Sequence, residues 1–186
     1  MITDGTITLR SWERDDLSAF TRWFNDPEVT VYLGNAYPCL NGEQETRFYE
    51  SSLDDKHRYS IIVNEEDRLI GNCSLMEIDH ANRMAEVGIV LGEKDCWSQG
   101  YGRRALALLL EIGFCGLGLN RVYLRLAAFN HRGYRCYQAA GFCEEGRARQ
   151  AMFVQGAFHD EIRMSVLADD YLREHERTST FQLDLT

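Results

Sequence analysis

The segment Trp97-Ser98-Gln99-Gly100-Tyr101-Gly102-Arg103-Arg104 stands between an apolar run, residues 85–91, and a longer apolar segment, residues 103–117. Its glycines predict a turn that leads from a strand into a helix, and a further strand is expected at residues 122–128. Such glycines let backbone N–H groups approach an anion at the helix N-terminus, where the helix dipole is equivalent to about +0.5 charge. We expect a pyrophosphate site at residues 99–104, and the alternative is a turn without a ligand.

The same turn excludes two common nucleotide motifs. It lacks the G-K-[ST] sequence of a P-loop. It also lacks the third glycine of a dinucleotide fingerprint, and no acidic residue ends a following parallel strand. The expected anion site is therefore of another kind.

The residues before this unit predict two helices and the start of a sheet. A short strand is expected at residues 6–10, followed by an amphipathic helix at residues 13–24. A second helix is expected at residues 42–53, with Phe48 and Tyr49 facing inward. Three apolar or alternating runs, separated by polar turns, then predict an antiparallel meander. These runs are residues 59–63, 69–76 and 85–91.

The residues after the unit predict a short helix and a hairpin. Asn130 is expected to cap the helix, and residues 142–152 and 158–167 to form the hairpin. The tail is polar after about residue 170 and is expected to be peripheral. Together these elements predict one domain over residues 1–186, of the α+β class, with a mixed, mostly antiparallel sheet flanked by helices.

The composition is that of a soluble domain. The chain has 186 residues, of which 45% are hydrophobic and 26% charged, and it is too short for two comfortable domains. No apolar stretch is long enough to span a membrane, and the first residues do not resemble an export signal. Six cysteines without a C-x-x-C pair indicate reduced thiols and a cytoplasmic location. Five widely separated histidines argue against a metal site.

Charge is distributed unevenly along the chain. Residues 1–67 hold 14 acidic and 6 basic residues, whereas residues 99–149 hold eight arginines and three glutamates. Because the net charge is −9, the chain offers no broad basic face for a nucleic acid, and we expect no such partner. A small polyanion bound beside a cationic substrate fits the pattern. The alternative is that these charges are simply solvated.

A second motif follows the predicted strand at residues 122–128. Asn130, Tyr134 and Tyr137 lie at i, i+4 and i+7 of the next helix, so an amide and two phenols share one face. This polar stripe predicts a ligand groove. The alternative is that both tyrosines pack in the core with satisfied hydroxyl groups.

The two motifs together resemble the GNAT superfamily of acetyl-CoA-dependent N-acetyltransferases. The match joins residues 99–104 to Asn130 and to Tyr137-Gln138-Ala139-Ala140-Gly141-Phe142, in the order and spacing that the family uses. The resemblance covers residues 6–171 and is closest to the Rim-type protein N-terminal acetyltransferases and the spermidine N-acetyltransferases. Trp97 departs from the pattern, because many members have Arg or Gln there.

The resemblance implies a sheet that is splayed between residues 85–91 and 122–128, where acetyl-CoA enters. It implies that backbone groups of one strand hold the pantetheine arm and polarise the acetyl oxygen, and that Asn130 binds the arm from the other side. The strand residues are Ile89, Val90 and Leu91. The pyrophosphate would be held by Gln99, Gly100, Tyr101, Gly102, Arg103 and Arg104.

Two residues are expected to carry the chemistry that the resemblance implies. Glu86 would take the proton of the amine, directly or through water, unless it only faces solvent. Tyr137, with an ordinary pKa near 10, would protonate a thiolate whose thiol has a pKa near 8.5. A covalent route through Cys136 is less favoured, because His131 lies about 140° round the helix and cannot easily activate that thiol.

The acceptor is expected to be a cationic primary amine, and a spermidine-like polyamine is the first candidate. A protein N-terminus and an amino-sugar or antibiotic amine are the alternatives. A different class of protein, a non-catalytic acyl-CoA sensor, would need neither Tyr137 nor Glu86. A homodimer is expected only because related enzymes commonly form one. Candidate acceptor contacts are Tyr32, His80, His159 and Asp160, with Tyr37 and Phe153 as further aromatic candidates.

Overall fold

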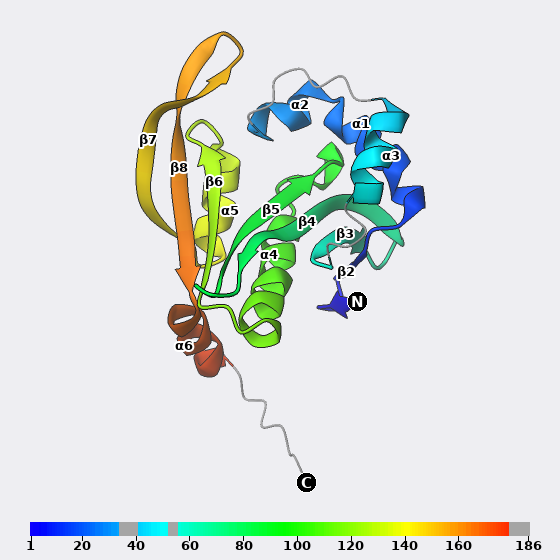
Figure 1. The fold of residues 1–186 in the computed structure, drawn as a ribbon. Coiled ribbons are helices and arrows are strands. Elements are labelled where there is room, and N and C mark those ends of the chain that lie inside the picture. Colours follow the sequence, from blue (N-terminus) through cyan, green and yellow to red (C-terminus); the bar gives the residue numbers. More distant parts are fainter. Residues whose placement is uncertain (34–40, 52–55, 179–186) are drawn as a thin grey trace.

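The computed structural model describes residues 1–33, 41–51 and 56–178. Within them the chain forms one eight-stranded open sheet in the order β1-β2-β3-β4-β5-β6-β8-β7, with helices on both faces (Figure 1). The strands are β1 (Ile2–Thr3), β2 (Ile7–Ser11), β3 (Arg58–Val63), β4 (Arg68–Asp79), β5 (Met84–Leu91), β6 (Arg121–Ala127), β7 (Cys143–Val154) and β8 (Ala157–Leu167). The α-helices are α1 (Leu17–Phe24), α2 (Pro27–Thr30), α3 (Gly42–Ser51), α4 (Tyr101–Glu111), α5 (His131–Ala139) and α6 (Ala168–Thr178). This confirms the predicted α+β class.

The sheet is splayed at its centre. All neighbouring strands are antiparallel except β5 and β6, which run parallel and are joined by α4. Their pairing has only three residue pairs and ends at Glu86 and Tyr123. Both strands continue beyond these residues, so alternate N–H and C=O groups of residues 87–91 face the split without a partner strand in the described part of the sheet.

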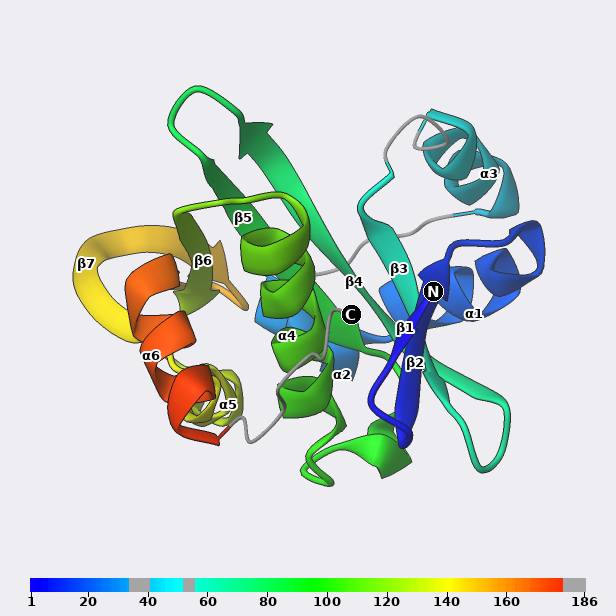
Figure 2. The ribbon, with the colours of Figure 1, turned by 90° about the horizontal axis from the view of Figure 1, so that it is seen from below.

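The core lies mainly between α4 and the sheet. The pattern of β6 explains why, because Val122, Leu124 and Leu126 alternate with more exposed residues and turn one apolar face toward the helices. On α4, Leu106 and Leu109 are fully buried against this face. Figure 2 shows α4 in front of β4 and β5, with α1 and α2 behind them. A second apolar cluster around Phe20 and Trp23 fills that opposite side.

Four local features differ from what the sequence predicts. The first helix begins as a 3₁₀ turn, η1 (Arg14–Asp16), in which Glu13 and Asp16 form a capping box. Phe48 is only partly covered: it is 44% exposed although its ring lies 6.1 Å from that of Trp12, whereas Tyr49 is partly buried. The tail is not wholly peripheral, because α6 places Tyr171 against Phe114 with ring centroids 5.0 Å apart. The segment after α4 closes in a single π-helical turn, η4 (Ile112–Gly116).

Candidate active site

A cleft opens where β5 and β6 diverge, between the start of α4 and α5. It has a volume of about 300 Å³. The residues that line it come from the α2 region, β5, the glycine turn and α5: Val29, Tyr32, Leu33, Ile89, Val90, Leu91, Trp97, Ser98, Gly100, Gly102, Arg103, Asn130, Arg132, Gly133, Arg135, Cys136 and Tyr137. The two sequence motifs are therefore brought together at the split in the sheet.

The glycine turn has the conformation that its sequence predicts. Gly100 has φ +88°, in the left-handed region that favours glycine, and it is the N-cap of α4. The first N–H groups of an α-helix have no partner within the helix, so they are free to meet an anion. Gly102 lies close to α5, because an added Cβ atom would be 3.3 Å from Cys136 Sγ. The turn thus brings the start of α4 against the wall of the cleft.

Half of the predicted pyrophosphate residues line the cleft, namely Gly100, Gly102 and Arg103. The side chains of the other three are engaged elsewhere. Gln99 donates to the carbonyl oxygen of Asp95, Arg104 forms an ion pair with Asp4 at 2.7 Å, and Tyr101 packs against the main core.

Two arginines in the cleft were not among the predicted contacts. Arg132 and Arg135 line it from α5, and the Arg132 guanidinium lies 3.7 Å from the centre of a Trp97 ring. Tyr32 packs on the same guanidinium from 5.2 Å. The arginine-rich composition of residues 99–149 was the only sequence signal for them. With Arg103 they make the cleft positive, as a polyanionic ligand requires.

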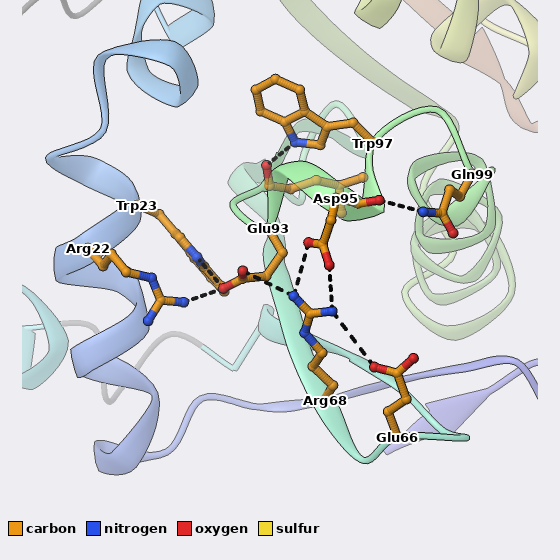
Figure 3. Close-up of polar contacts among 9 residues, drawn as sticks. Arg22, Trp23, Glu66, Arg68, Glu93, Asp95, Trp97 and Gln99 are labelled. Atoms are coloured by element: carbon orange, nitrogen blue, oxygen red, sulfur yellow. Dashed lines mark hydrogen bonds and ion pairs between the residues drawn. The ribbon is translucent and has the colours of Figure 1, made fainter.

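A polar network fixes the segment that leads into the glycine turn (Figure 3). Glu93 accepts a hydrogen bond from Trp23 Nε1 at 2.9 Å and contacts Arg22 and Arg68. Arg68 also binds both carboxylate oxygens of Asp95, at 2.8 and 3.0 Å. This network connects α1, β4 and the 3₁₀ helix η3 (Lys94–Cys96).

Trp97 anchors the other side of the same segment. Its Nε1 donates to the carbonyl oxygen of Leu91 at 2.8 Å, which joins the turn to the end of β5 (Figure 3). The backbone at Trp97 is thereby held beside the strand that lines the cleft. Trp97, the residue at which this sequence departs from the family pattern, therefore has a structural role in holding the turn.

The second motif supplies an amide and one phenol to the cleft. Asn130 Oδ1 accepts from the backbone N–H of Gly133 at 2.9 Å and so caps α5, as predicted. Tyr137 lines the cleft, and burial raises the pKa of its phenol. Tyr134 does not share this groove: its hydroxyl donates to Glu144 at 2.9 Å. The predicted three-residue stripe is wrong in this respect.

Tyr137 also lines a second cavity, of about 340 Å³, which we name the Tyr137 cavity. Its residues are Tyr32, Leu33, Met76, Glu86, Val87, Gly88, Ile89, Arg125, Leu126, Ala127, Asn130, Tyr137, Met152 and Glu161. Glu86 does not simply face solvent, since it is 7% exposed and accepts from Arg125 Nε at 2.9 Å and Nη2 at 3.1 Å. Arg125 and Glu161 are further residues of the cavity that the predicted set lacks.

The predicted acceptor contacts are divided by the structure. Tyr32 lines both the cleft and the Tyr137 cavity. His159 packs edge-on against Phe129 at 4.7 Å, and Phe129 lies 6.3 Å from Tyr32. Asp160 accepts from the backbone N–H of Gln150, at an irregular point of the β7–β8 pairing.

The other acceptor candidates lie away from the cavities. His80 is exposed in the turn between β4 and β5, at the opposite end of β5 from the cleft. Phe153 is exposed and packs on Phe158 near the tip of the β7–β8 hairpin. Tyr37 lies outside the described residues.

Other kinds of site find little support in the described part of the chain. The five cysteines that the structure describes are free thiols, and burial raises the pKa of Cys136, which disfavours its thiolate. Among the described residues, no group of three or more His, Cys, Asp or Glu side chains is placed to hold a metal ion. None of the described helices combines the length and apolarity that crossing a membrane requires.

Comparison with known proteins identifies the family. A family model described as an acetyltransferase (GNAT) domain matches residues 6–143, and the chain belongs to this family. An uncharacterized N-acetyltransferase, p20, of Bacillus licheniformis is 31% identical over 170 residues, covering 89% of this chain and 94% of the relative. The protein is accordingly an N-acetyltransferase, an acyltransferase of the GNAT type.

Two further comparisons concern a named activity. The spermidine N(1)-acetyltransferase of Vibrio cholerae is 29% identical over 171 residues, covering 91% of this chain and 98% of the relative. The crystal structure of a spermidine N-acetyltransferase from Vibrio cholerae, in complex with CoA and spermine, matches with a TM-score of 0.84. It is 27% identical and the match covers 91% of this chain and 99% of that one. The fold is thus shared with a protein whose crystal structure contains CoA and spermine.

Proposed function

We propose that this protein transfers the acetyl group of acetyl-CoA directly to a cationic primary amine, with a spermidine-like polyamine as the first acceptor. The observation that carries the proposal is the Tyr137 cavity, which joins a phenol, Tyr137, to two carboxylates, Glu86 and Glu161, beside the open edge of β5. Arg125 neutralises part of the charge of Glu86, so the second carboxylate, Glu161, leaves the cavity lining with a net negative charge, which favours a cationic amine. The phenol is a suitable acid for a thiolate.

Acetyl-CoA would supply an activated acetyl group as its thioester. The start of α4 and three arginines, Arg103, Arg132 and Arg135, would hold its phosphates. Backbone groups of residues 87–91 would bind the pantetheine arm in the way that a sheet edge binds an added strand. One backbone N–H would polarise the acetyl oxygen. Asn130 would contact the arm from α5.

The proton movements follow from the two side chains. Glu86 accepts one proton from the ammonium group, directly or through water, and the free amine forms the new C–N bond with the acetyl carbon. The C–S bond breaks, and the departing thiolate takes a proton from the Tyr137 hydroxyl. The nitrogen loses its second proton as the neutral amide forms, and that proton restores the Tyr137 hydroxyl, directly or through water. Burial raises the pKa of Tyr137, so the phenol holds its proton until the thiolate appears.

The test measures release of free thiol from acetyl-CoA, corrected for hydrolysis without an acceptor. We expect turnover with spermidine, and Glu86→Gln and Tyr137→Phe each to lower kcat by about 100-fold or more. Tyr134→Phe is the matched control, because its hydroxyl binds Glu144 outside the cleft, and it should retain wild-type turnover.

The acceptor comparison also separates the alternatives. Turnover only with a peptide bearing a free N-terminus would indicate that the acceptor is a protein N-terminus and not a polyamine. Turnover only with an amino sugar would indicate an amino-sugar or antibiotic acceptor. Binding of acetyl-CoA without thiol release under any acceptor would establish a sensor instead. We also infer a cytoplasmic location from the scattered cysteines, and a homodimer remains an expectation for light scattering to test.

A further inference from the structure

The Glu86–Arg125 ion pair separates two cavities on one face of the sheet. On one side is the Tyr137 cavity. On the other is a cavity of about 410 Å³, which we name the Glu77 cavity. Its residues are Glu77, Met84, Glu86, Arg121, Tyr123, Leu124, Arg125, Glu145, Arg163 and Met164. Glu86 and Arg125 are the two residues that line both cavities, so their side chains form the boundary between them.

The position of the pair explains why it can act as a boundary. The ladder between β5 and β6 ends at Glu86 and Tyr123, and Arg125 is two residues further along β6. Arg125 reaches back across the opening split and binds both oxygens of the buried carboxylate, at 2.9 and 3.1 Å. Two parallel hydrogen bonds fix the guanidinium plane more firmly than one would. The split is therefore closed on one side by a side chain rather than by backbone.

We propose that Arg125 is the end wall of the acceptor pocket and limits the length of the amine that the Tyr137 cavity accepts. This inference rests on the proposed transfer to an amine. An acceptor whose amino group lies at Glu86 meets the guanidinium if its chain extends toward the Glu77 cavity. The wall blocks that direction sterically and repels a second ammonium group placed there, so the further ammonium groups of a polyamine would have to lie on the side away from the Glu77 cavity.

The space behind the wall can receive a longer acceptor. The Glu77 cavity contains Glu77, whose carboxylate accepts from Tyr123 at 3.2 Å. Of the other two carboxylates there, Glu145 is paired with Arg121 and Glu86 with Arg125. Removing the Arg125 side chain would join the two cavities into one trough with an acidic group at the far end.

The experiment measures kcat/KM for linear primary alkylamines of increasing length, with wild type and three variants. In wild type, kcat/KM should rise with each methylene and then stop rising at the chain length that reaches Arg125. In Arg125→Ala this break should move to a chain at least about two carbons longer, and the longer amines should gain about fourfold per added methylene. Arg125→Lys retains a cation beside Glu86 and should keep the wild-type break.

Arg163→Ala is the matched control. Arg163 lies opposite Arg125 in the β6–β8 pairing and lines the Glu77 cavity but not the Tyr137 cavity. Its loss removes the same charge, together with a 3.6 Å contact to Glu161, but leaves the wall. The position of the break is the readout, because loss of Arg125 also changes the surroundings of Glu86 and hence the absolute rate. Arg125→Ser provides the same truncation if Arg125→Ala does not fold.

The position of the break tests whether Arg125 is the end wall of the acceptor pocket. A break that moves in Arg125→Ala and stays in Arg163→Ala supports the wall. A break that stays in Arg125→Ala, or that moves equally in Arg163→Ala, overturns the wall and leaves the proposed amine acetylation intact. If the wild-type protein acetylates neither spermidine nor any amine of the series, both proposals are overturned.

Discussion

Replacing Glu93 with alanine should both destabilise the protein and weaken its binding of acetyl-CoA. Trp23 is 2% exposed and its Nε1 donates to Glu93, so the variant leaves a buried donor unpaired at a cost of about 2 kcal/mol. The contacts with Arg68 and Arg22 are partly or largely exposed and add about 1 kcal/mol together. The total of about 3 kcal/mol corresponds to a Tm lower by about 6–12 °C.

The assay combines urea unfolding with the KM for acetyl-CoA. The KM should rise in Glu93→Ala, because Glu93 fixes the segment that leads to Gly100 (Figure 3). Glu93→Gln retains an acceptor for Trp23 and should lose only about 1 kcal/mol. Glu66→Ala is the control: Glu66 contacts the same Arg68 at 3.7 Å but is 61% exposed, so its loss should cost less than about 0.5 kcal/mol. Equal losses in Glu66→Ala and Glu93→Ala would refute the reasoning.

Three further outcomes are expected. Because burial raises the pKa of Tyr137, kcat should not decline with an apparent pKa below about 10, and a decline near pH 8 in a thiol-release profile would contradict its role as acid. Burial alone would raise the pKa of Asp16, but hydrogen bonds from Arg10 and Ser60 lower it. In urea unfolding, Asp16→Asn should therefore lower the free energy of unfolding by about 3 kcal/mol at pH 7. The difference from wild type should shrink as the pH falls below about 4, where Asp16 becomes protonated. Gly92→Ala places a Cβ atom 1.9 Å from the Trp23 ring and should cost about 3 kcal/mol in urea unfolding. In the same experiment Gly116→Ala, whose Cβ atom meets no atom within 4 Å, should cost less than about 1 kcal/mol.

The periodicity of apolar residues predicted the helices and strands because each buried face is formed by residues close together in the sequence. The alternation of Val122, Leu124 and Leu126 is a property of consecutive residues, and so is the glycine turn at Gly100. The structure confirms both. The last helix, α6, was not predicted, because the polar sequence of the tail conceals one buried side chain, Tyr171, whose partner Phe114 lies far back in the chain.

The site was less predictable wherever it depends on strand register. Glu86 and Arg125 are 39 positions apart, and only the short parallel pairing of β5 and β6 brings them together. Tyr134 and Tyr137 differ by about 60° around their helix, which is enough for one to meet Glu144 and the other the cleft. The spacing of residues on a helix cannot predict where Glu144 of β7 lies relative to that helix.

The short parallel ladder has a consequence for how ligand occupancy can be observed. Three residue pairs, the Glu86–Arg125 ion pair and the packing of α4 join the two halves of the sheet. A ligand seated in the split would connect both halves only in the folded state. By mass action, such a ligand at 100 times its Kd stabilises the folded state by about 2.7 kcal/mol. That corresponds to a thermal shift of about 5–10 °C for a chain of this size. A melting curve recorded with acetyl-CoA and no amine would therefore report the filling of the split before any acetyl group is transferred.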